Sequence, residues 1–367
     1  MHSDRNRYPQ LEVDLDRLQE NLAALSQRCQ SSSIEIAGVV KGFSALPEIV
    51  QVFDRAGFQY LASSRMEQLR RMAASGVRTP LMLIRVPMLS ELADVAALTE
   101  LSLQSDLTVL RALDREARRL GKRHKVILMA DLGDLREGFW LRDELTAAAA
   151  EVETRLSGLE LAGVGTNLGC YGSVKATPEK MAELVDAARA VEDVIGRRLE
   201  ILSGGSSTSI HMVLDGTMPP RINQLRLGEA LLLGHILGCD MDFLHRDVFT
   251  FRAEVAECRD KPSYPVGELS ADSFGCVPHF TDRGIRRRAL LAAGRVDYGS
   301  PADLLPRRKG VEILGASSDH TLLDVEDIRD EIHVGDLLEF DLCYAAMVYL
   351  TQAEGVHVVF RQGGRYI

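Results

Sequence analysis

A lysine directly follows the first strongly apolar, β-branched run of the chain. Lys41 stands in the segment GVVKG, after the run IEIAGVV. If this run is a buried strand, the amine lies in a partly dry environment, where desolvation lowers the pKa of lysine and makes it a nucleophile or a Schiff-base former. The alternative is a surface lysine whose stem covers apolar residues while its charge stays in water.

Hydroxyl groups and glycines gather after a later apolar run. The segment SGGSSTS (203–209) contains two glycines, which let a ligand approach the backbone, and the hydroxyls of Ser206 and Ser207. A helix is expected to begin there, and its unpaired N–H groups favour an anion such as phosphate. The alternative is a helix cap in a tight turn that binds no ligand.

An arginine interrupts the last of these apolar runs. Arg226 precedes Gly228 in INQLRLGEALLLG. An arginine in a buried strand is costly unless a carboxylate or a ligand compensates its charge, so a structural salt bridge is the alternative to a site. A lysine, a group of hydroxyls with N–H donors, and an arginine together suit a phosphorylated aldehyde. Pyridoxal phosphate is such a cofactor.

Two further segments with polar side chains follow apolar runs. DLGDLREGF (131–139) contains Arg136, and the segment from 166 to 172 contains Asn167 and Cys170. A lone asparagine often forms a turn, and a lone cysteine is often a small buried residue. The carboxylates of Asp134 and Glu137 could bind a basic side chain of a substrate, with solvated loop carboxylates as the alternative.

The elements that position these residues alternate regularly. Continuous apolar runs are typical of strands buried on both faces, and alternation with helices indicates parallel strands with right-handed crossovers. The runs lie at 34–40, 60–62, 81–86, 101–104, 125–132, 159–166, 199–205 and 223–228. The predicted helices lie at 11–30, 47–56, 65–74, 90–98, 107–120, 142–156 and 178–195.

Eight strand candidates match the closure number of the (β/α)8 barrel. In that fold the chemistry lies at the C-terminal ends of the strands, and phosphate often binds after strands seven and eight. We therefore predict an α/β chain with a (β/α)8 TIM-type barrel over 11–240; a doubly wound open sheet is the alternative. Residues 241–367 predict a smaller, mainly antiparallel β domain, with which residues 1–10 are expected to pack. Its strand candidates lie at 249–260, 288–296, 311–317, 320–325 and 336–342.

Composition narrows the class of protein. The 367 residues are 46% hydrophobic and 26% charged, which excludes wholesale disorder. The formal net charge of −10 argues against a general nucleic-acid or anionic-membrane surface, and no apolar run approaches the roughly 18–20 residues of a membrane span. The N-terminus has no apolar signal-peptide core. The cysteines, at 29, 170, 239, 258, 276 and 343, lack CxxC or metal-like spacing, so we expect reduced thiols in a cytoplasmic protein and no metal site.

Over essentially its whole length the chain resembles the fold-type III pyridoxal-phosphate enzymes, the alanine racemase group. Within that group it is most similar to the alanine/ornithine racemase-like branch. The segments that carry the resemblance are LEVDLDRLQENL, GVVKG, DLGDLREGF, GTNLGCYG, SGGSSTS, INQLRLGEALLLG and LGASSDHTLLDV.

The resemblance implies a role for each matching position. Lys41 would hold the cofactor as an internal aldimine, Arg136 would lie near its phenolic oxygen, and Asn167 would stand where alanine racemases carry a histidine against the ring. Arg226 would face the pyridine nitrogen, where its charge disfavours protonation, weakens the ring as an electron sink and favours proton transfer over decarboxylation. The residues expected to contact the phosphate are Ser206, Ser207, Gly228 and Glu229.

Two positions depart from the family pattern. Alanine racemases carry a lysine where this chain has Met129, and a catalytic tyrosine where it has Arg295. The second acid/base therefore cannot be transferred from the family. The candidates are the neighbouring Asp319 and His320, Cys170 and Tyr344.

The resemblance predicts an isomerase that racemises a free amino acid of the ornithine, alanine, lysine or serine type. Two groups would move the Cα proton through an external aldimine, and Lys41 would be one of them. The resemblance also implies a homodimer with shared active sites. The alternatives are a decarboxylase or aldolase of the same fold, and a non-catalytic protein of pyridoxal-phosphate homeostasis.

Overall fold

The chain folds into two compact units. The computed structural model describes residues 7–236, 239, 241–271, 274–275, 277 and 279–367. One unit runs from Leu18 to His245, and the other joins the N-terminal residues as far as Arg17 to Arg246–Ile367. Residues 1–6, Asp240 and Cys276, which entered the sequence predictions, lie outside the described residues.

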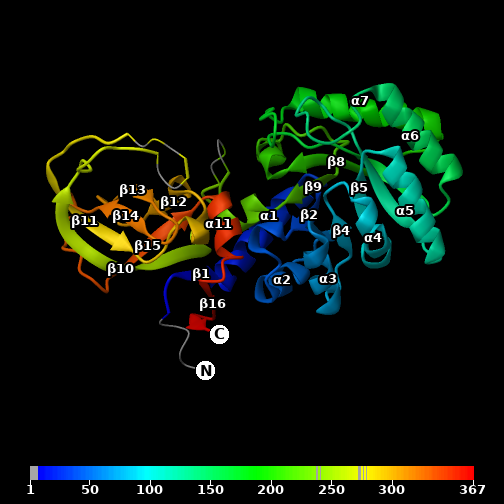
Figure 1. Cartoon of the computed structure of the whole chain (residues 1–367). Helices are drawn as coiled ribbons and strands as arrows, with labels where there is room; N and C mark the ends of the chain where they lie inside the picture. The colour runs from blue at the N-terminus through cyan, green and yellow to red at the C-terminus, as the bar shows by residue number, and fades with distance from the viewer. Residues whose placement is uncertain (1–6, 237–238, 240, 272–273, 276, 278) are drawn as a thin grey trace. The chain divides into compact units, whose positions relative to one another are not determined.

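The first unit is a closed barrel of parallel strands (Figure 1). Each of the eight apolar runs forms one of its strands, which confirms the predicted barrel over the open sheet. Closure comes from pairing of the first barrel strand with the last, with Ala37 opposite Arg226. The strands are β2 (Glu35–Val39), β3 (Tyr60–Ser63), β4 (Leu81–Leu83), β5 (Leu101–Gln104), β6 (His124–Met129), β7 (Leu159–Gly165), β8 (Ile201–Ser206) and β9 (Gln224–Leu227).

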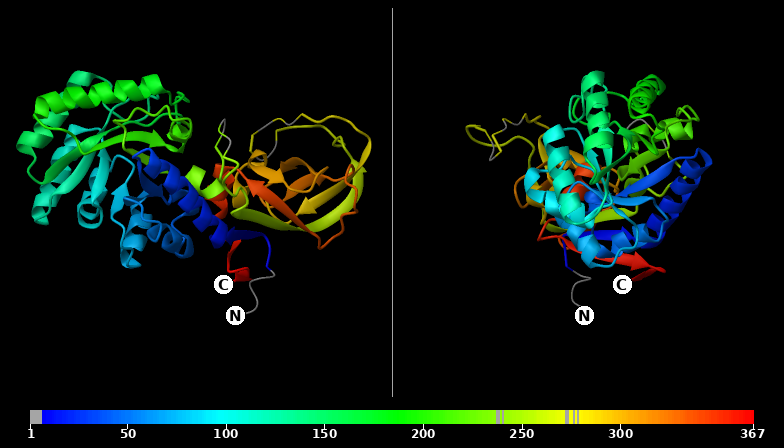
Figure 2. Two further views of the ribbon diagram at one scale, coloured as in Figure 1. Left: turned by 180° about the vertical axis from the view of Figure 1, so that it is seen from behind. Right: turned by 90° about the vertical axis from the view of Figure 1, so that its right-hand side faces the viewer.

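Helices follow the strands and form the outer layer of the barrel (Figure 2). Local signals set their ends. The Asp106 carboxylate accepts the backbone N–H groups of Thr108 and Val109 at the start of α5, and the last long helix begins with Pro178 and ends at Gly196, whose φ is 72°. The helices are α1 (Leu15–Ser31), α2 (Pro47–Asp54), α3 (Met66–Ala74), α4 (Leu92–Leu98), α5 (Leu107–Arg119), α6 (Arg142–Arg155), α7 (Pro178–Ile195), α8 (Ile210–Leu214) and α9 (Glu229–Leu233).

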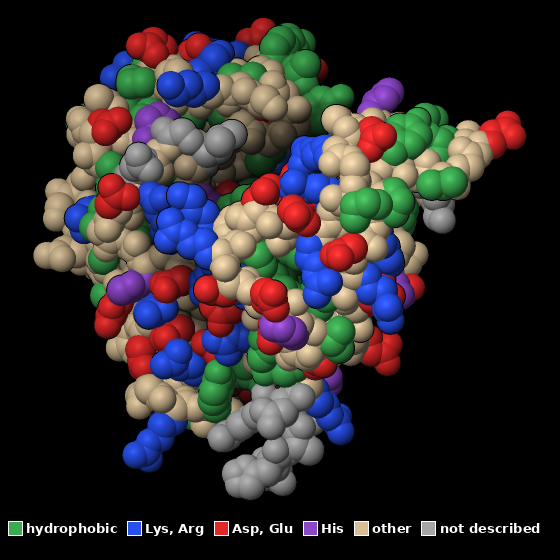
Figure 3. Space-filling view, turned by 90° about the vertical axis from the view of Figure 1, so that its left-hand side faces the viewer, with side chains coloured by type: hydrophobic (Ala, Val, Ile, Leu, Met, Phe, Trp, Pro, Cys, Tyr) green, Lys and Arg blue, Asp and Glu red, His purple; other side chains and the backbone are tan. Residues whose placement is uncertain are grey.

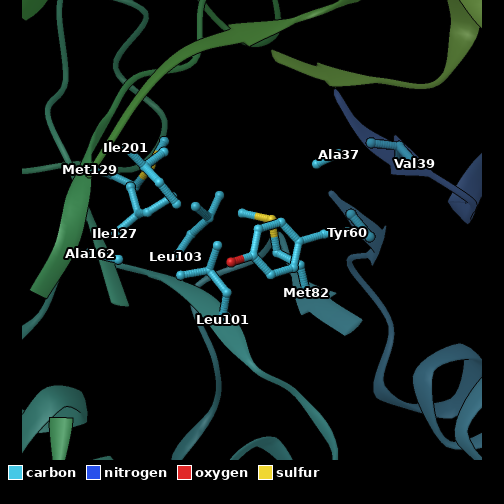
Figure 4. Packing of buried hydrophobic residues seen from close by; sticks show 11 residues of the cluster. Ala37, Val39, Tyr60, Met82, Leu101, Leu103, Ile127, Met129, Ala162 and Ile201 are labelled. Carbon is cyan, nitrogen blue, oxygen red and sulfur yellow. The ribbon is translucent and has the colours of Figure 1, made fainter. Parts of the chain in front are cut away.

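Inward-facing side chains fill the barrel, as Figure 4 shows. They include Val39, Tyr60, Met82, Leu103 and Met129, each at most 5% exposed. Burying each large apolar side chain contributes about 1.5–3 kcal/mol. The interior is thus a packed core, and ligands are left to the rim where the strands end.

The second unit is built on a mainly antiparallel sheet, as predicted, in which β1 and β16 form a parallel pair. Its main strand order is β13-β14-β11-β10-β1-β16-β17, and β15 joins β10 to β12. The strands are β1 (Gln10–Asp14), β10 (Phe249–Pro262), β11 (Ile285–Leu291), β12 (Leu304–Pro306), β13 (Glu312–Ala316), β14 (Thr321–Asp324), β15 (Leu337–Leu342), β16 (His357–Gln362) and β17 (Arg365–Tyr366). Two short helices, α10 (Arg295–Tyr298) and α11 (Tyr344–Leu350), complete the unit.

The helix predicted over 11–30 is wrong at its beginning. Residues 10–14 form β1, which pairs with β10 on one side and β16 on the other. Leu11 and Val13 are fully buried, and the Asp14 carboxylate accepts the N–H groups of Asp16 and Arg17 at 3.1 Å. The ladders on both sides stabilise a strand at the first positions, and Asp14 then starts α1.

The strand predicted over 288–296 ends early, at Leu291. The chain turns at Gly294, whose N–H donates to the Asp297 carboxylate at 2.9 Å, and α10 begins at Arg295. A Cβ at Gly294 would lie 2.2 Å from the carbonyl oxygen of Ser318, so the close approach of the two chain segments requires glycine.

The described residues place some further limits. No helix among them is long and apolar enough to cross a membrane, and no cluster of three or more His, Cys, Asp or Glu side chains there could hold a metal ion. The described cysteines are free thiols. On the face shown in Figure 3, Lys and Arg side chains are interspersed with Asp and Glu side chains, so neither sign of charge dominates that face.

Candidate active site

Lys41 lies directly after β2, at the carboxyl end of the barrel strands. It is half-buried, between the fully buried Val40 and Phe43. Burial is the main reason that the pKa of Lys41 is lowered. The charges of Arg136 and Arg226 lower this pKa further, whereas Cys170 opposes the shift. A lowered pKa raises the fraction of neutral amine, the form that attacks an aldehyde.

Arg226 is held inside β9 by neutral oxygens. Its side chain is 4% exposed. Its Nη1 donates to the Ser203 hydroxyl at 2.5 Å, and its Nη2 donates to the backbone oxygen of Thr166 at 2.7 Å. Within the described ranges no carboxylate lies at ion-pair distance from the guanidinium, so the structural salt bridge considered from the sequence is not present there.

The electrostatics of Arg226 follow from this burial. Burial lowers the pKa of Arg226 to about 10, with a smaller contribution in the same direction from Arg136. The group therefore stays cationic near neutral pH. A buried charge without a carboxylate is costly, which favours a ligand as its counterpart.

The segment after β8 presents hydroxyls at the rim. Gly205 has a φ of 110°, and a Cβ on it would lie 2.6 Å from the Ser209 hydroxyl, so this turn requires glycine. The Ser206 and Thr208 hydroxyls lie 3.1 Å apart. The buried Ser209 hydroxyl oxygen has no hydrogen-bond partner.

Ser207 connects this segment to the one after β9. Its hydroxyl oxygen accepts the N–H groups of Gly228 at 3.3 Å and Ala230 at 3.2 Å. Its own O–H stays available to donate. The phosphate contacts expected of the Gly228 and Glu229 N–H groups stay a prediction, because the Gly228 N–H is directed at Ser207. Burial raises the pKa of the Glu229 carboxyl.

These residues fit pyridoxal phosphate. An amine with a lowered pKa suits the aldehyde, and the hydroxyls around the unpartnered Ser209 suit a phosphate. The uncompensated charge of Arg226 suits an acceptor such as a ring nitrogen. The donor set therefore matches three different parts of one cofactor.

Asp134, by contrast, is an anchor for two loops rather than a substrate contact. Its carboxylate is 1% exposed and accepts four backbone N–H groups, at 3.0–3.3 Å, from Gly169, Cys170, Tyr171 and Val174. Burial opposes ionisation of Asp134, but these hydrogen bonds outweigh it, and the net effect is a lowered pKa. Sequence reasoning missed this role, although an aspartate beside glycine-rich loops is typical of such anchors.

We expect Asp134→Asn to destabilise the protein by about 2–6 kcal/mol. The amide keeps one acceptor oxygen, so about two buried N–H groups lose their partner, at about 1–3 kcal/mol each. Urea unfolding followed by fluorescence of Trp140, the only tryptophan of the chain, measures the change.

The matched control is Asp186→Asn, because Asp186 is exposed on α7 and pairs with its helix neighbour Arg189. It should change stability by less than about 1 kcal/mol. Since the folded-state pKa of Asp134 is lowered, its contribution is present above its unfolded pKa of about 3.9 and is lost as the pH falls through the folded value. Equal stability of wild type and Asp134→Asn at pH 7 would show that the four hydrogen bonds do not hold the loops.

The loops anchored by Asp134 carry three of the predicted site residues. Arg136 donates from Nη2 to the Glu137 carboxylate at 2.5 Å, and this interaction raises the pKa of Arg136. Asn167 Nδ2 lies 3.0 Å from the sulfur of Cys170, which is exposed. Glu137 is thus already paired within the chain.

The other candidates lie in the second unit. Asp319 and His320 are exposed in the turn between β13 and β14, where the Ser317 hydroxyl accepts the His320 N–H at 3.2 Å. In the part of the chain that the structure describes, no hydrogen bond or ion pair joins their two side chains. Tyr344 is half-buried and begins α11.

A family model decides the affiliation of the chain. The model described as the N-terminal domain of alanine racemase matches residues 13–235, which covers the barrel and Lys41. The chain belongs to the alanine racemase family. Members of this family generally depend on pyridoxal phosphate, in agreement with the donor set at the rim.

Curated relatives extend the match to nearly the whole chain. An ornithine racemase from Acetoanaerobium sticklandii is 38% identical over 93% of this chain and 96% of its own length. A lysine racemase from Thermotoga maritima is 37% identical over 96% and 98%. The resemblance drawn from the sequence and the prediction of an isomerase of the racemase class are therefore confirmed.

Solved structures agree on the fold. An alanine racemase from Clostridium difficile matches with a TM-score of 0.72 at 18% identity, over 98% of this chain and 97% of its own. A D-threonine aldolase from Filomicrobium marinum matches equally well, with a TM-score of 0.73 at 17% identity over 98% and 93%. At these identities the likeness concerns the fold alone, so it does not choose between racemisation and aldol cleavage.

Proposed function

We propose that this member of the alanine racemase family racemises a free amino acid with pyridoxal phosphate held by Lys41. The observation that carries the proposal is the convergence of a half-buried lysine of lowered pKa and a buried, uncompensated arginine at one end of the barrel. Ornithine and lysine are the first substrates to test, because two relatives bear those names. Alanine and serine follow.

Lys41 has two tasks in this proposal. When the cofactor is bound, Lys41 Nζ would hold it through the aldehyde carbon with loss of water, and the cofactor would supply an electron sink for the negative charge that develops at Cα. Once the amino group of the substrate has displaced it, the same amine removes or returns the proton at Cα on one face. The lowered pKa of Lys41 favours the neutral amine that both tasks require.

Arg226 directs the reaction towards proton transfer. We place its fixed cation opposite the pyridine nitrogen, where it disfavours a proton on that nitrogen. The hydrogen bonds to Ser203 and Thr166 hold the guanidinium in position for this task. A ring kept unprotonated is a weaker sink, which restrains decarboxylation and other side reactions.

The remaining cofactor contacts are proposed from the rim. The hydroxyls of Ser206 and Ser207, with the N–H group of Glu229, would bind the phosphate; the Gly228 N–H would have to leave the Ser207 hydroxyl to join them. Arg136, oriented by Glu137, lies near the phenolic oxygen.

Asn167, near Cys170, lies against the ring. Each of these residues matches a position of the family pattern, and each lies at the same rim of the barrel.

The second acid/base lies on the opposite face of the substrate. We propose His320, with Asp319 beside it in the β13–β14 turn, because an imidazole can both accept and donate a proton. A homodimer in which the second unit of one subunit completes the site of the other would bring this turn to the cofactor. Cys170 and Tyr344 are the competing donors.

Exchange in deuterium oxide tests this two-base scheme. Wild-type enzyme should introduce deuterium at Cα of both enantiomers of ornithine. His320→Ala should abolish racemisation while Lys41 still exchanges the proton of one enantiomer, because each base serves one face. Chiral chromatography with mass spectrometry gives both quantities at once.

Three outcomes would transfer the role of second acid/base from His320 to another residue or contradict the racemase function. Normal racemisation by His320→Ala, together with loss of one direction of exchange in Cys170→Ala or Tyr344→Phe, transfers the second base to that residue. Release of carbon dioxide or of an aldehyde without racemisation would support the decarboxylase or aldolase alternative. Retained chirality with every amino acid tested would support a homeostasis role.

A further inference from the structure

The second unit contains a cavity of about 610 Å³. It lies within the sheet region of β11, β13 and β14, and the described residues that line it belong to this unit. Its volume falls in the range of small-molecule sites, about 300–1,000 Å³. Arg295, which stands where alanine racemases carry a catalytic tyrosine, is one of its lining residues, but none of the roles proposed above is assigned to Arg295.

Acidic side chains at the cavity are already neutralised within the chain. Glu312 accepts from Arg283 Nη1 at 2.8 Å, and Asp324 accepts from Arg286 Nε at 2.9 Å. These pairs leave no net negative charge on their side of the wall. The charge balance of the cavity therefore depends on the remaining basic residues.

Two further arginines line the cavity without a carboxylate. Among the described residues no ion pair involves Arg288 or Arg295, and the Nε atom of each is buried without a hydrogen-bond partner. Arg288 donates one hydrogen bond, from Nη2 to the backbone oxygen of Ser263, at 3.0 Å. The guanidinium carbon of Arg295 lies 4.2 Å from the centroid of the Phe274 ring. A ring stacked on the flat face of a guanidinium leaves its edge N–H groups free to donate.

Apolar side chains complete the walls. Ile313 and Leu314 of β13, Leu322 of β14, and Phe280 line the same cavity. A site that combines unpaired guanidinium donors with aliphatic and aromatic walls matches an anionic group on an apolar body. A bare inorganic anion would leave these walls in contact with water.

We propose that this cavity binds a small organic carboxylate, whose head is held by Arg288 and Arg295 and whose apolar part packs against β13 and Phe280. Arginine binds carboxylates through paired N–H groups, and both guanidinium groups line the cavity without a carboxylate partner among the described residues. The proposal goes beyond the racemase function, and its test measures binding without turnover, so its failure can be told apart from a failure of the racemase proposal.

Isothermal titration of the full-length protein with benzoate tests the proposal, with benzamide as the uncharged probe of the same shape and inorganic phosphate as the bare anion. Benzoate should bind, and benzamide and phosphate should bind at least about tenfold more weakly, because loss of a charge-assisted contact costs about that factor. Arg288→Gln and Arg295→Gln should each weaken benzoate at least about tenfold. Arg287→Gln is the matched control: this residue pairs with Asp260 and does not line the cavity, so benzoate affinity should stay within about twofold.

Arg288→Lys and Arg295→Lys keep the charge but remove the Nε donor. They replace the glutamine variants in the benzoate titration if a glutamine variant fails to fold. Each should bind benzoate more weakly than wild type. Repeating the benzoate titration in saturating ornithine distinguishes the sources of the carboxylate: a weaker apparent affinity assigns the site to the amino-acid substrate, and an unchanged one to a separate organic acid. Equal binding of benzoate and benzamide, or wild-type benzoate affinity in both the Arg288 and Arg295 variants, would overturn the proposal.

Discussion

Lys41→Ala is expected to lose racemase activity altogether in a standard assay. Removal of a proton-transfer group alone slows catalysis by about 10²–10⁴-fold, and loss of the covalent bond to the cofactor adds to this. Activity is measured by chiral chromatography of ornithine in both directions. The matched control is Lys175→Ala, because Lys175 is exposed; it should keep wild-type activity.

The same variant allows a test that does not need turnover. Borohydride reduction of wild-type protein incubated with pyridoxal phosphate should leave a phosphopyridoxyl group on the peptide that contains Lys41. Lys41→Ala should retain no label at that peptide, whereas Lys175→Ala should be labelled like wild type. A label on Lys175 or Lys180 in the wild-type protein would show that Lys41 is not the residue that holds the cofactor.

Arg226→Glu should slow racemisation by at least about tenfold and raise the share of transamination. A carboxylate opposite the pyridine nitrogen favours a proton there, and a pKa change of one unit already corresponds to about a factor of ten. A stronger electron sink would allow protonation away from Cα, so the amino acid would leave as a keto acid while its amino group stays on the cofactor. The keto acid and both amino-acid enantiomers are quantified in one reaction.

Arg226→Gln separates this effect from structural damage. The glutamine amide can still donate to the oxygens of Ser203 and Thr166, which the arginine binds at 2.5 and 2.7 Å, but it carries no charge. We expect a product ratio between those of wild type and Arg226→Glu. If both variants fold and keep the wild-type ratio of products, Arg226 has a structural role only.

Much of the barrel could be predicted because its signals are local. Continuous apolar runs alternate with helical stretches, and this pattern does not depend on distant partners. The strand β1 could not be recognised in the same way. Its partners are residues 249–252 and 357–361, so the pairing that overrides the helical spacing of residues 11–14 is invisible in the local sequence.

In the candidate site, too, the residues with a local signal could be predicted, whereas those that depend on distant partners could not. Lys41 and Arg226 could be identified because a charged residue at or in an apolar strand is unusual wherever the strand lies. The role of Asp134 depends on backbone N–H groups more than thirty residues away, which no spacing rule reveals. The second acid/base is harder still, because Cys170 lies in the barrel unit and His320 in the other, and side-chain type alone does not rank them.

Incubation of the purified protein and pyridoxal phosphate with L-ornithine and, separately, with D-ornithine is the most direct test of the central claim. The two enantiomers have equal free energy, so a racemase must bring both reactions to the same equal mixture, as seen by chiral chromatography. Parallel reactions with lysine, alanine and serine cover the other proposed substrates. We expect convergence from both sides for at least one of these amino acids, and its disappearance in Lys41→Ala. Unchanged chirality of all four, in protein shown by borohydride reduction to carry the cofactor, would contradict the account.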